Sequence, residues 1–151
     1  MGLLISHSPE ETESIGRCWG DEAAQGWLVL LRGDLGAGKT QLVKGIARGL
    51  GIESRVHSPT FSLINIYTGG RFALFHLDLY RLNGREEIIG AGLEEYLRTD
   101  GVTVIEWAER WFGELSPGAS VPAEIPRPFR WATLEHLNEN ERRISYEDFG
   151  A

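Results

Sequence analysis

The segment Gly33–Thr40 constrains this chain more than any other feature, because its sequence Gly-Asp-Leu-Gly-Ala-Gly-Lys-Thr fits the phosphate-binding pattern G-x-x-x-x-G-K-[ST] in full. Glycines in such a loop let backbone N–H groups turn toward a phosphate chain, and the following helix offers its positive N-terminal end. Lys39 can reach the β- and γ-phosphates, and the Thr40 hydroxyl can bind Mg²⁺. The segment therefore predicts a nucleotide-binding loop.

The residues on both sides of the loop predict an α/β fold. The apolar run Trp27–Leu31 is typical of a short buried strand that enters the loop, and Thr40–Leu50 is typical of a helix that leaves it. Leu3–Ile5 predicts a first strand. Ser8 can cap the next helix, which has a proline and two glutamates in its first turn and should extend to about Gly20.

Further along the chain, strand patterns occur both singly and in hairpins. The expected elements are a hairpin of Ile64–Tyr67 and Arg71–Leu77, a helix at Arg85–Arg98, a strand at Val102–Ile105, and a terminal hairpin of Phe129–Leu137 and Arg142–Tyr146. Four of the six prolines fall between residues 113 and 128, which predicts a loop there. Two hairpins among alternating strands and helices predict a mixed sheet.

Length and composition limit the classes of protein to consider. A chain of 151 residues fits one domain, expected over residues 1–151, with residues 119–151 forming the terminal hairpin packed on the rest. The net charge is −7 and only two residues are lysines, so direct binding to nucleic acid is disfavoured unless the arginines gather on one face. The longest apolar run, Trp27–Leu31, is far too short to cross a membrane, so no membrane association is expected.

Cys18 is the only cysteine, so the chain can form no internal disulfide and no cysteine-based zinc site. This usage suits a reducing compartment, and we expect a cytoplasmic protein. Ile15, Cys18 and Trp19 have the spacing of one apolar helix face. We therefore expect the Cys18 side chain to pack in the core.

Two acids are candidates to complete the site, because a nucleotide-hydrolysing site needs carboxylates at the ends of core strands. Glu106 directly follows the strand Val102–Ile105, although a surface acid at a strand end would have the same pattern. Asp78 lies in the segment His-Leu-Asp-Leu-Tyr-Arg, whose alternation puts His76, Asp78 and Tyr80 on one face. A hydrated face explains that pattern nearly as well. We interpret His76 as a hydrogen-bonded structural residue, and the histidines lack zinc-ligand spacing.

Several motifs occur in a fixed order along the chain. They are Glu11-Thr12 with Gly16, the loop Gly33–Thr40, Ser58-Pro59-Thr60-Phe61, His76-Leu77-Asp78-Leu79-Tyr80-Arg81, Gly92-Leu93-Glu94-Glu95-Tyr96 and Ile105-Glu106-Trp107-Ala108-Glu109-Arg110. Together these motifs resemble the TsaE (YjeE) family over about residues 8–111, and the joint pattern is highly specific. The resemblance implies an α/β fold of the P-loop NTPase type, a three-layer sandwich with a mixed central sheet.

The resemblance also implies a function and a set of site residues. It implies a small bacterial P-loop ATPase that binds ATP and Mg²⁺ and works with TsaD and TsaB in making threonylcarbamoyladenosine in tRNA. Hydrolysis would reset the TsaB–TsaD assembly between turnovers, and tRNA would be met only through that complex. ATP would contact Thr12, Gly33, Leu35, Gly36, Ala37, Gly38, Lys39 and Thr40. Mg²⁺ would bind to Thr40 and Glu106, the catalytic residues would be Lys39, Asp78 and Glu106, and Ser58–Phe61 resembles a switch-like segment.

The residues leave other classes of function open. A small-molecule kinase is one, since P-loop kinases can be nearly this short, but the sequence has no arginine-rich lid. A nucleotide-sensing scaffold that binds ATP without useful hydrolysis is another, and Asp78 and Glu106 argue against it only weakly. A GTPase is disfavoured because neither Lys39 nor Lys44 follows an asparagine, as the guanine-reading motif Asn-Lys-x-Asp requires.

Overall fold

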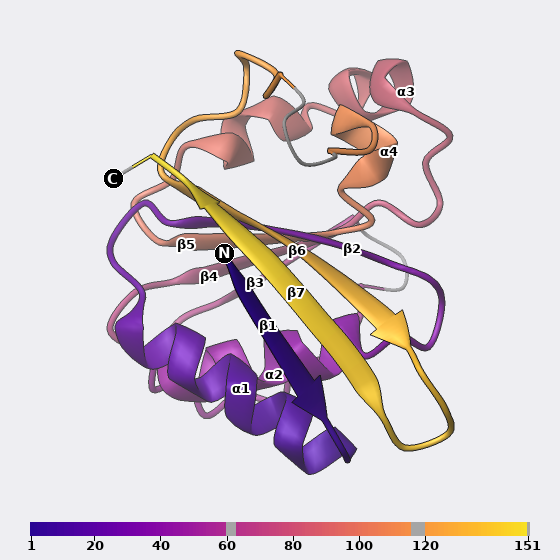
Figure 1. Cartoon of the computed structure of the whole chain (residues 1–151). Coiled ribbons are helices and arrows are strands. Elements are labelled where there is room, and N and C mark those ends of the chain that lie inside the picture. Colours follow the sequence, from indigo (N-terminus) through magenta and orange to yellow (C-terminus); the bar gives the residue numbers. More distant parts are fainter. Residues whose placement is uncertain (60–62, 116–119, 151) are drawn as a thin grey trace.

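One seven-stranded sheet contains every strand of the residues that this computed structural model describes, which are 1–59, 63–115 and 120–150 (Figure 1). The elements are β1 (Gly2–Ser6), α1 (Pro9–Glu22), β2 (Leu28–Gly33), α2 (Lys39–Gly49), β3 (Ile64–Tyr67), β4 (Leu74–Asp78), α3 (Arg85–Gly90), the 3₁₀ helix η1 (Leu93–Leu97), β5 (Val102–Glu106), α4 (Glu109–Phe112), β6 (Phe129–His136) and β7 (Arg142–Phe149). The strand order is β1-β7-β6-β2-β5-β4-β3. Strand β6 pairs directly with β2, so the terminal hairpin belongs to the central sheet.

Four neighbouring strands form a parallel centre, and the outer strands are antiparallel. Strand β2 pairs in parallel with β5 on one side and with β6 on the other, and β4 pairs in parallel with β5. Strands β3, β7 and β1 are antiparallel to their neighbours, which confirms the predicted mixed sheet. Because parallel strands end at the same edge, the carboxyl ends of β2, β4, β5 and β6 lie together. Ligands bind at this edge in open α/β sheets.

Helices cover both faces of the sheet, which confirms the predicted three-layer α/β fold (Figure 1). Helices α1 and α2 lie on one face, and Val29 and Leu31 of β2 pack in the same core cluster as them. Helices α3, η1 and α4 lie on the other face, where Leu28 and Leu30 belong to the second cluster. All four of these β2 side chains are buried, as expected for the central strand of a parallel sheet.

The two long helices approach each other so closely that their contact requires glycine. A Cβ atom on Gly45 would lie 2.0 Å from the carbonyl oxygen of Glu13. Cβ atoms on Gly16, Gly20 and Gly49 would each lie 2.2 Å from a backbone oxygen of the facing helix. Since real Cβ atoms do not approach so closely, any side chain here would force the helices apart. The contact therefore holds the start of α1 beside the loop that precedes α2.

Most predicted boundaries are confirmed to within a few residues. The Ser8 hydroxyl accepts a hydrogen bond of 3.1 Å from the Glu11 N–H and so caps α1, as predicted. Strand β4 begins at Leu74 and not at Arg71, whose Nη2 instead lies 2.6 Å from the carbonyl oxygen of Gly20 at the end of α1. No helix within the described ranges is long and apolar enough to cross a bilayer.

The prediction that Cys18 packs in the core is wrong, because its side chain is exposed. The buried face of α1 contains Thr12, Gly16, Trp19 and Gly20. Close contact with α2 requires the glycines to face inward, and residue 18 lies on the opposite side of the helix from residues 16 and 20. The apolar pattern was therefore overridden by the need for a close helix contact.

The single helix predicted over Arg85–Arg98 is also wrong. Helix α3 ends at Gly90, Gly92 adopts a left-handed φ of 77°, and η1 follows. A left-handed residue interrupts the helical backbone, and glycine adopts this conformation without steric cost. The break allows Ile88 before it and Leu93 after it both to reach the core, where both are buried.

Candidate nucleotide-binding site

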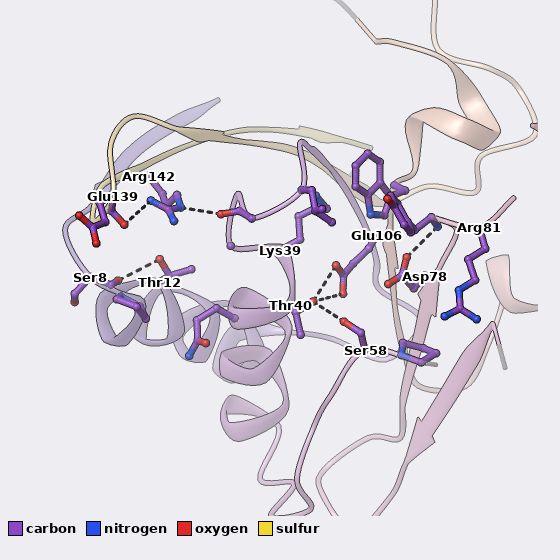
Figure 2. Close-up of a pocket in the computed structure, with 18 of the residues that line it drawn as sticks. Ser8, Thr12, Lys39, Thr40, Ser58, Asp78, Arg81, Glu106, Glu139 and Arg142 are labelled. Atoms are coloured by element: carbon purple, nitrogen blue, oxygen red, sulfur yellow. Dashed lines mark hydrogen bonds between the residues drawn. The ribbon is translucent and has the colours of Figure 1, made fainter. Parts of the chain in front are cut away.

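A cavity of about 520 Å³ lies along the carboxyl edge of the sheet (Figure 2). Five parts of the chain surround it: the start of α1, the loop with the first turn of α2, the segment before β3 that contains Ser58, the ends of β4 and β5, and the turn between β6 and β7. Of the predicted site residues, those that line the cavity are Thr12, Leu35, Gly36, Gly38, Lys39, Thr40, Asp78 and Glu106. The volume is in the range of small-molecule binding sites.

The loop between β2 and α2 has the backbone of a phosphate-binding loop. Gly36 and Gly38 have left-handed φ angles of 80° and 98°, a conformation that side chains disfavour. Gly38 is the N-cap of α2 and has no side chain to bond to the N–H groups of the first turn. These N–H groups therefore remain for an anionic ligand, with the helix dipole favouring negative charge.

Lys39, the first residue of α2, folds back over the loop and is only 4% exposed. Its Nζ donates hydrogen bonds to the carbonyl oxygens of Gly33 and Asp34, the latter at 2.8 Å. The same atom lies 4.1 Å from the centroid of the Trp107 ring. Burial lowers the pKa of Lys39, while the Glu106 carboxylate acts in the opposite direction. The lysine charge is thus held at the loop by two carbonyl oxygens and the Trp107 ring.

Thr40 connects the loop with the end of β5. Its Oγ1 donates to the Glu106 carboxylate, at 3.1 Å from Oε2 and 3.2 Å from Oε1. The Oγ of Ser58 lies 2.9 Å from the same Thr40 oxygen (Figure 2). The cluster gathers two hydroxyls and one carboxylate, which are the hard oxygen ligands that Mg²⁺ prefers.

The composition of this cluster also decides which metals it suits. Residues 1–59, 63–115 and 120–150 contain no group of three or more His, Cys, Asp or Glu side chains placed to hold a metal. Mg²⁺ binding needs no such group, because this ion keeps several waters and is usually held by one or two carboxylates together with phosphate oxygens. The residues present therefore fit Mg²⁺ bound with a nucleotide.

Glu106 is the last residue of β5 and is 2% exposed. His76 of β4 contacts it from within the sheet, with Nε2 at 2.6 Å from Oε2. This contact confirms that His76 is hydrogen-bonded. An acid so deeply buried is inconsistent with the alternative that Glu106 is a surface acid at a strand end.

Asp78 lies beside Glu106, because the register of β4 and β5 pairs these two residues. Its Oδ1 accepts a hydrogen bond of 3.0 Å from the Tyr80 N–H. Burial raises the pKa of Asp78, and the nearby Glu106 carboxylate raises it further. A carboxyl group with a raised pKa at a strand end is suited to accept a proton.

Two predicted ATP-binding residues, Gly33 and Ala37, do not line the cavity. Gly33 packs against β6, since a Cβ atom there would lie 2.5 Å from the carbonyl oxygen of Leu134. Ala37 is fully buried in the core cluster on the α1–α2 side. Both residues therefore lie on the side of the loop that faces away from the cavity and pack against the rest of the fold. In the switch-like segment, Ser58 lines the cavity, whereas residues 60 and 61 lie outside the described ranges.

The terminal hairpin adds residues that the sequence motifs do not indicate. The Arg142 Nε donates to the carbonyl oxygen of Gly36 at 3.2 Å (Figure 2). Its Nη1 donates to the carbonyl oxygen of Asn138 at 2.7 Å. Glu139 and Asn140 line the same wall of the cavity. No local spacing could have found this contact, because Arg142 and Gly36 are 106 residues apart and meet only through the pairing of β6 with β2.

The fold, the loop and the strand-end acids define a member of the P-loop class of α/β proteins. A family model described as "Threonylcarbamoyl adenosine biosynthesis protein TsaE" matches residues 6–143. The chain therefore belongs to the TsaE family, as the resemblance of its motifs predicted.

Similar proteins agree with this assignment over most of their length. The chain is 36% identical to the tRNA threonylcarbamoyladenosine biosynthesis protein TsaE of Bacillus subtilis, over 95% of this chain and 83% of that protein. It is 44% identical to the protein of the same name from Treponema pallidum, over 93% and 96%. The crystal structure of Bacillus subtilis YdiB matches with a TM-score of 0.76 and 32% identity, over 99% of this chain and 86% of that one. The structural similarity thus includes the terminal hairpin.

Proposed function

We propose that this chain is a cytoplasmic Mg²⁺-dependent ATPase that acts with TsaB and TsaD in the threonylcarbamoyladenosine modification of tRNA. The observation that carries the ATPase part is the hydrogen bond of Thr40, on the phosphate loop, to Glu106, at the end of the neighbouring strand, in the lining of one cavity. The names of the relatives, which are tRNA threonylcarbamoyladenosine biosynthesis proteins, support the pathway.

Each site residue has a defined task in this proposal. Lys39 leaves the loop carbonyl oxygens and binds the β- and γ-phosphates. Thr40 and Glu106 hold Mg²⁺, which when bound stabilises the charge that develops on the phosphates. Asp78, whose pKa is raised by burial, orients the attacking water and accepts its proton.

The test is an ATP hydrolysis assay of the isolated chain, with and without TsaB–TsaD, in Mg²⁺ and in EDTA. We expect slow hydrolysis by the chain alone, because a partner-coupled ATPase often lacks a group that the complex supplies or orders. TsaB–TsaD should raise the rate, and EDTA should abolish it. The Lys39→Ala protein, purified in the same way, controls for contaminating ATPases.

The same assay distinguishes the other classes of function. Fast turnover by the isolated chain, with phosphate transferred to a small metabolite, would identify a kinase. ATP binding without hydrolysis in every mixture would identify a nucleotide-sensing scaffold. Either result contradicts the proposed ATPase.

The charge distribution supports an indirect contact with tRNA. The net charge is −7, so RNA binding would need a cluster of available arginines. Arg85 forms an ion pair with Glu124, and Arg143 forms one with Glu135 at 3.2 Å. Arg142 donates to backbone carbonyls of the β6–β7 turn. We expect weak and strongly salt-dependent binding of tRNA to the isolated chain, and sub-micromolar affinity in a titration near physiological salt would contradict this.

A further inference from the structure

One buried side chain beside the Mg²⁺ ligands has no task in the function proposed above. His76 is fully buried and does not line the cavity, so it cannot touch a nucleotide there. Its Nε2 lies 2.6 Å from Oε2 of Glu106, and the two side chains are 0% and 3% exposed. Burial of such polar groups is costly unless each has a partner. The contact therefore restricts the two side chains to one relative geometry.

The hydrogen-bond partners of His76 indicate its tautomer. Carboxylate oxygens accept hydrogen bonds, so the proton of the contact is assigned to Nε2. The Nδ1 atom is buried and has no hydrogen-bond partner within the described residues. A proton on Nδ1 would be a buried donor without an acceptor, which is rarer and costlier than an unused lone pair. We therefore assign Nε2 of His76 as the donor of this contact.

The hydrogen bond from His76 makes the two oxygens of Glu106 unequal. Oε2 receives the short bond from His76, whereas Thr40 Oγ1 is almost equally distant from Oε2 and Oε1, at 3.1 and 3.2 Å. Rotation of the carboxylate would break the short bond. The donor is itself fixed, because β4 and β5 are paired neighbours in the parallel part of the sheet. His76 thus engages Oε2 and leaves Oε1, which faces the Thr40 hydroxyl, to a metal ion next to that hydroxyl.

We propose that His76 is a positioning residue for Mg²⁺, which holds the Glu106 carboxylate so that Oε1 and the Thr40 hydroxyl bind the ion together. This inference rests on the proposed ATPase function. It assigns His76 a task beyond stability, since a residue that only fills the core would not change how strongly Mg²⁺ promotes nucleotide binding. Removal of the partner of a metal ligand typically weakens metal binding about 10- to 100-fold.

The experiment measures binding of the non-hydrolysable ATP analogue AMP-PNP by calorimetry, in excess Mg²⁺ and in EDTA. The ratio of the two dissociation constants gives the enhancement by Mg²⁺. We expect this enhancement to fall about tenfold or more in His76→Leu, which has no donor, while the affinity in EDTA stays unchanged. His76→Gln should retain most of it, because the glutamine amide can occupy the place of Nε2. His76→Asn, whose amide reaches only the place of Nδ1, should behave like His76→Leu.

Each other outcome would overturn the inference in a recognisable way. An equal loss of affinity in Mg²⁺ and in EDTA would assign His76 to stability alone, and an unchanged enhancement in His76→Leu would leave it no role in metal binding. If His76→Leu does not fold, the Gln and Asn variants make the same comparison with a polar group retained. In the Glu106→Gln background, His76→Leu should add no further loss. Wild-type protein that binds no analogue under either condition would overturn the proposed function itself.

Discussion

The two faces of the sheet are built in opposite ways. On one face, α1 and α2 are 14 and 11 residues long and touch backbone to backbone through glycines such as Gly45. On the other face, α3 and α4 have 6 and 4 residues and pack through side chains such as Ile88 and Trp111, which are buried in one cluster with Leu28 and Leu30 of β2. Gly90 of α3 is exposed, and no described residue outside its own helix lies within 4 Å of the position of a Cβ there. One face is interlocked at the backbone, whereas the other is joined through side chains.

This difference matches what each face contributes to the site. The phosphate loop continues directly into α2, so its backbone is anchored by the close α1–α2 contact. The chain after Glu106 leads to the other face through Trp107, a non-glycine residue with a left-handed φ of 61°. Such a conformation is strained and is found mainly at functional sites. We infer that backbone contacts fix the phosphate loop, whereas side-chain contacts position the acids and Trp107 around it.

Glu106→Gln is expected to have the largest effect on activity. It tests whether the acids that side-chain contacts position carry ATP hydrolysis. ATP binding should persist, but the hydrolysis rate should fall about a hundred- to a thousandfold. The reason is that the lost charge stabilises the transition state more than the ground-state phosphate contacts. Phosphate release and ATP affinity should be measured on the same protein. Unchanged turnover would leave Glu106 as a structural partner of His76.

Lys39→Ala tests the phosphate loop, whose position the backbone contacts of α1 and α2 fix. We expect ATP to bind about a hundredfold more weakly, or about 2.7 kcal/mol, because a charge-assisted contact to phosphate is lost. The melting temperature should change little, since burial already disfavours the charged lysine, as its lowered pKa indicates. Lys44→Ala is the matched control, because Lys44 lies on the same helix and does not line the cavity. Unfolding of Lys39→Ala would contradict this prediction.

A pair of glycine substitutions tests the contrast between the faces directly. Gly45→Ala should destabilise the fold by about 1–3 kcal/mol, because the new Cβ would meet the Glu13 carbonyl oxygen at 2.0 Å. Gly90→Ala, in a helix with open space around it, should be neutral or stabilise by up to about 1 kcal/mol. Urea unfolding of both proteins measures the difference. Similar changes in the free energy of unfolding of the two proteins would contradict the proposed difference between the two faces of the sheet.

On stability, Asp78→Asn should have the smallest effect of these substitutions, and the size of that effect depends on pH. The pKa of Asp78 is raised above its ordinary 3.8, so the folded chain binds this proton more tightly than the unfolded chain. The aspartate therefore lowers stability as pH rises from 3.8 through the raised pKa. We expect Asp78→Asn to stabilise the fold near pH 7 by less than about 1 kcal/mol, with the gain vanishing toward acid pH. Urea unfolding at both pH values tests this, and a gain that persists in acid would contradict it.

Local patterns predicted those parts of the fold whose causes are local. The cap at Ser8, the strand that ends at Glu106 and the two hairpins follow from neighbouring residues. The same patterns failed for Cys18 and for the helix across Gly92, where a distant helix or the need to bury residues on both sides of a break decided the outcome. Propensity and periodicity are weak when tertiary contacts oppose them.

The sequence by itself determined the phosphate loop, because the glycines, the helix start, Lys39 and Thr40 are neighbours in the chain and act over short distances. Only the tertiary structure decided what meets that loop. Glu106 with His76 comes to it from β5 and β4, and Arg142 comes from the terminal hairpin. These contacts depend on which strands pair with β2. The pairing is set by burial of both faces of the whole sheet, so it cannot be predicted from any short segment of the sequence.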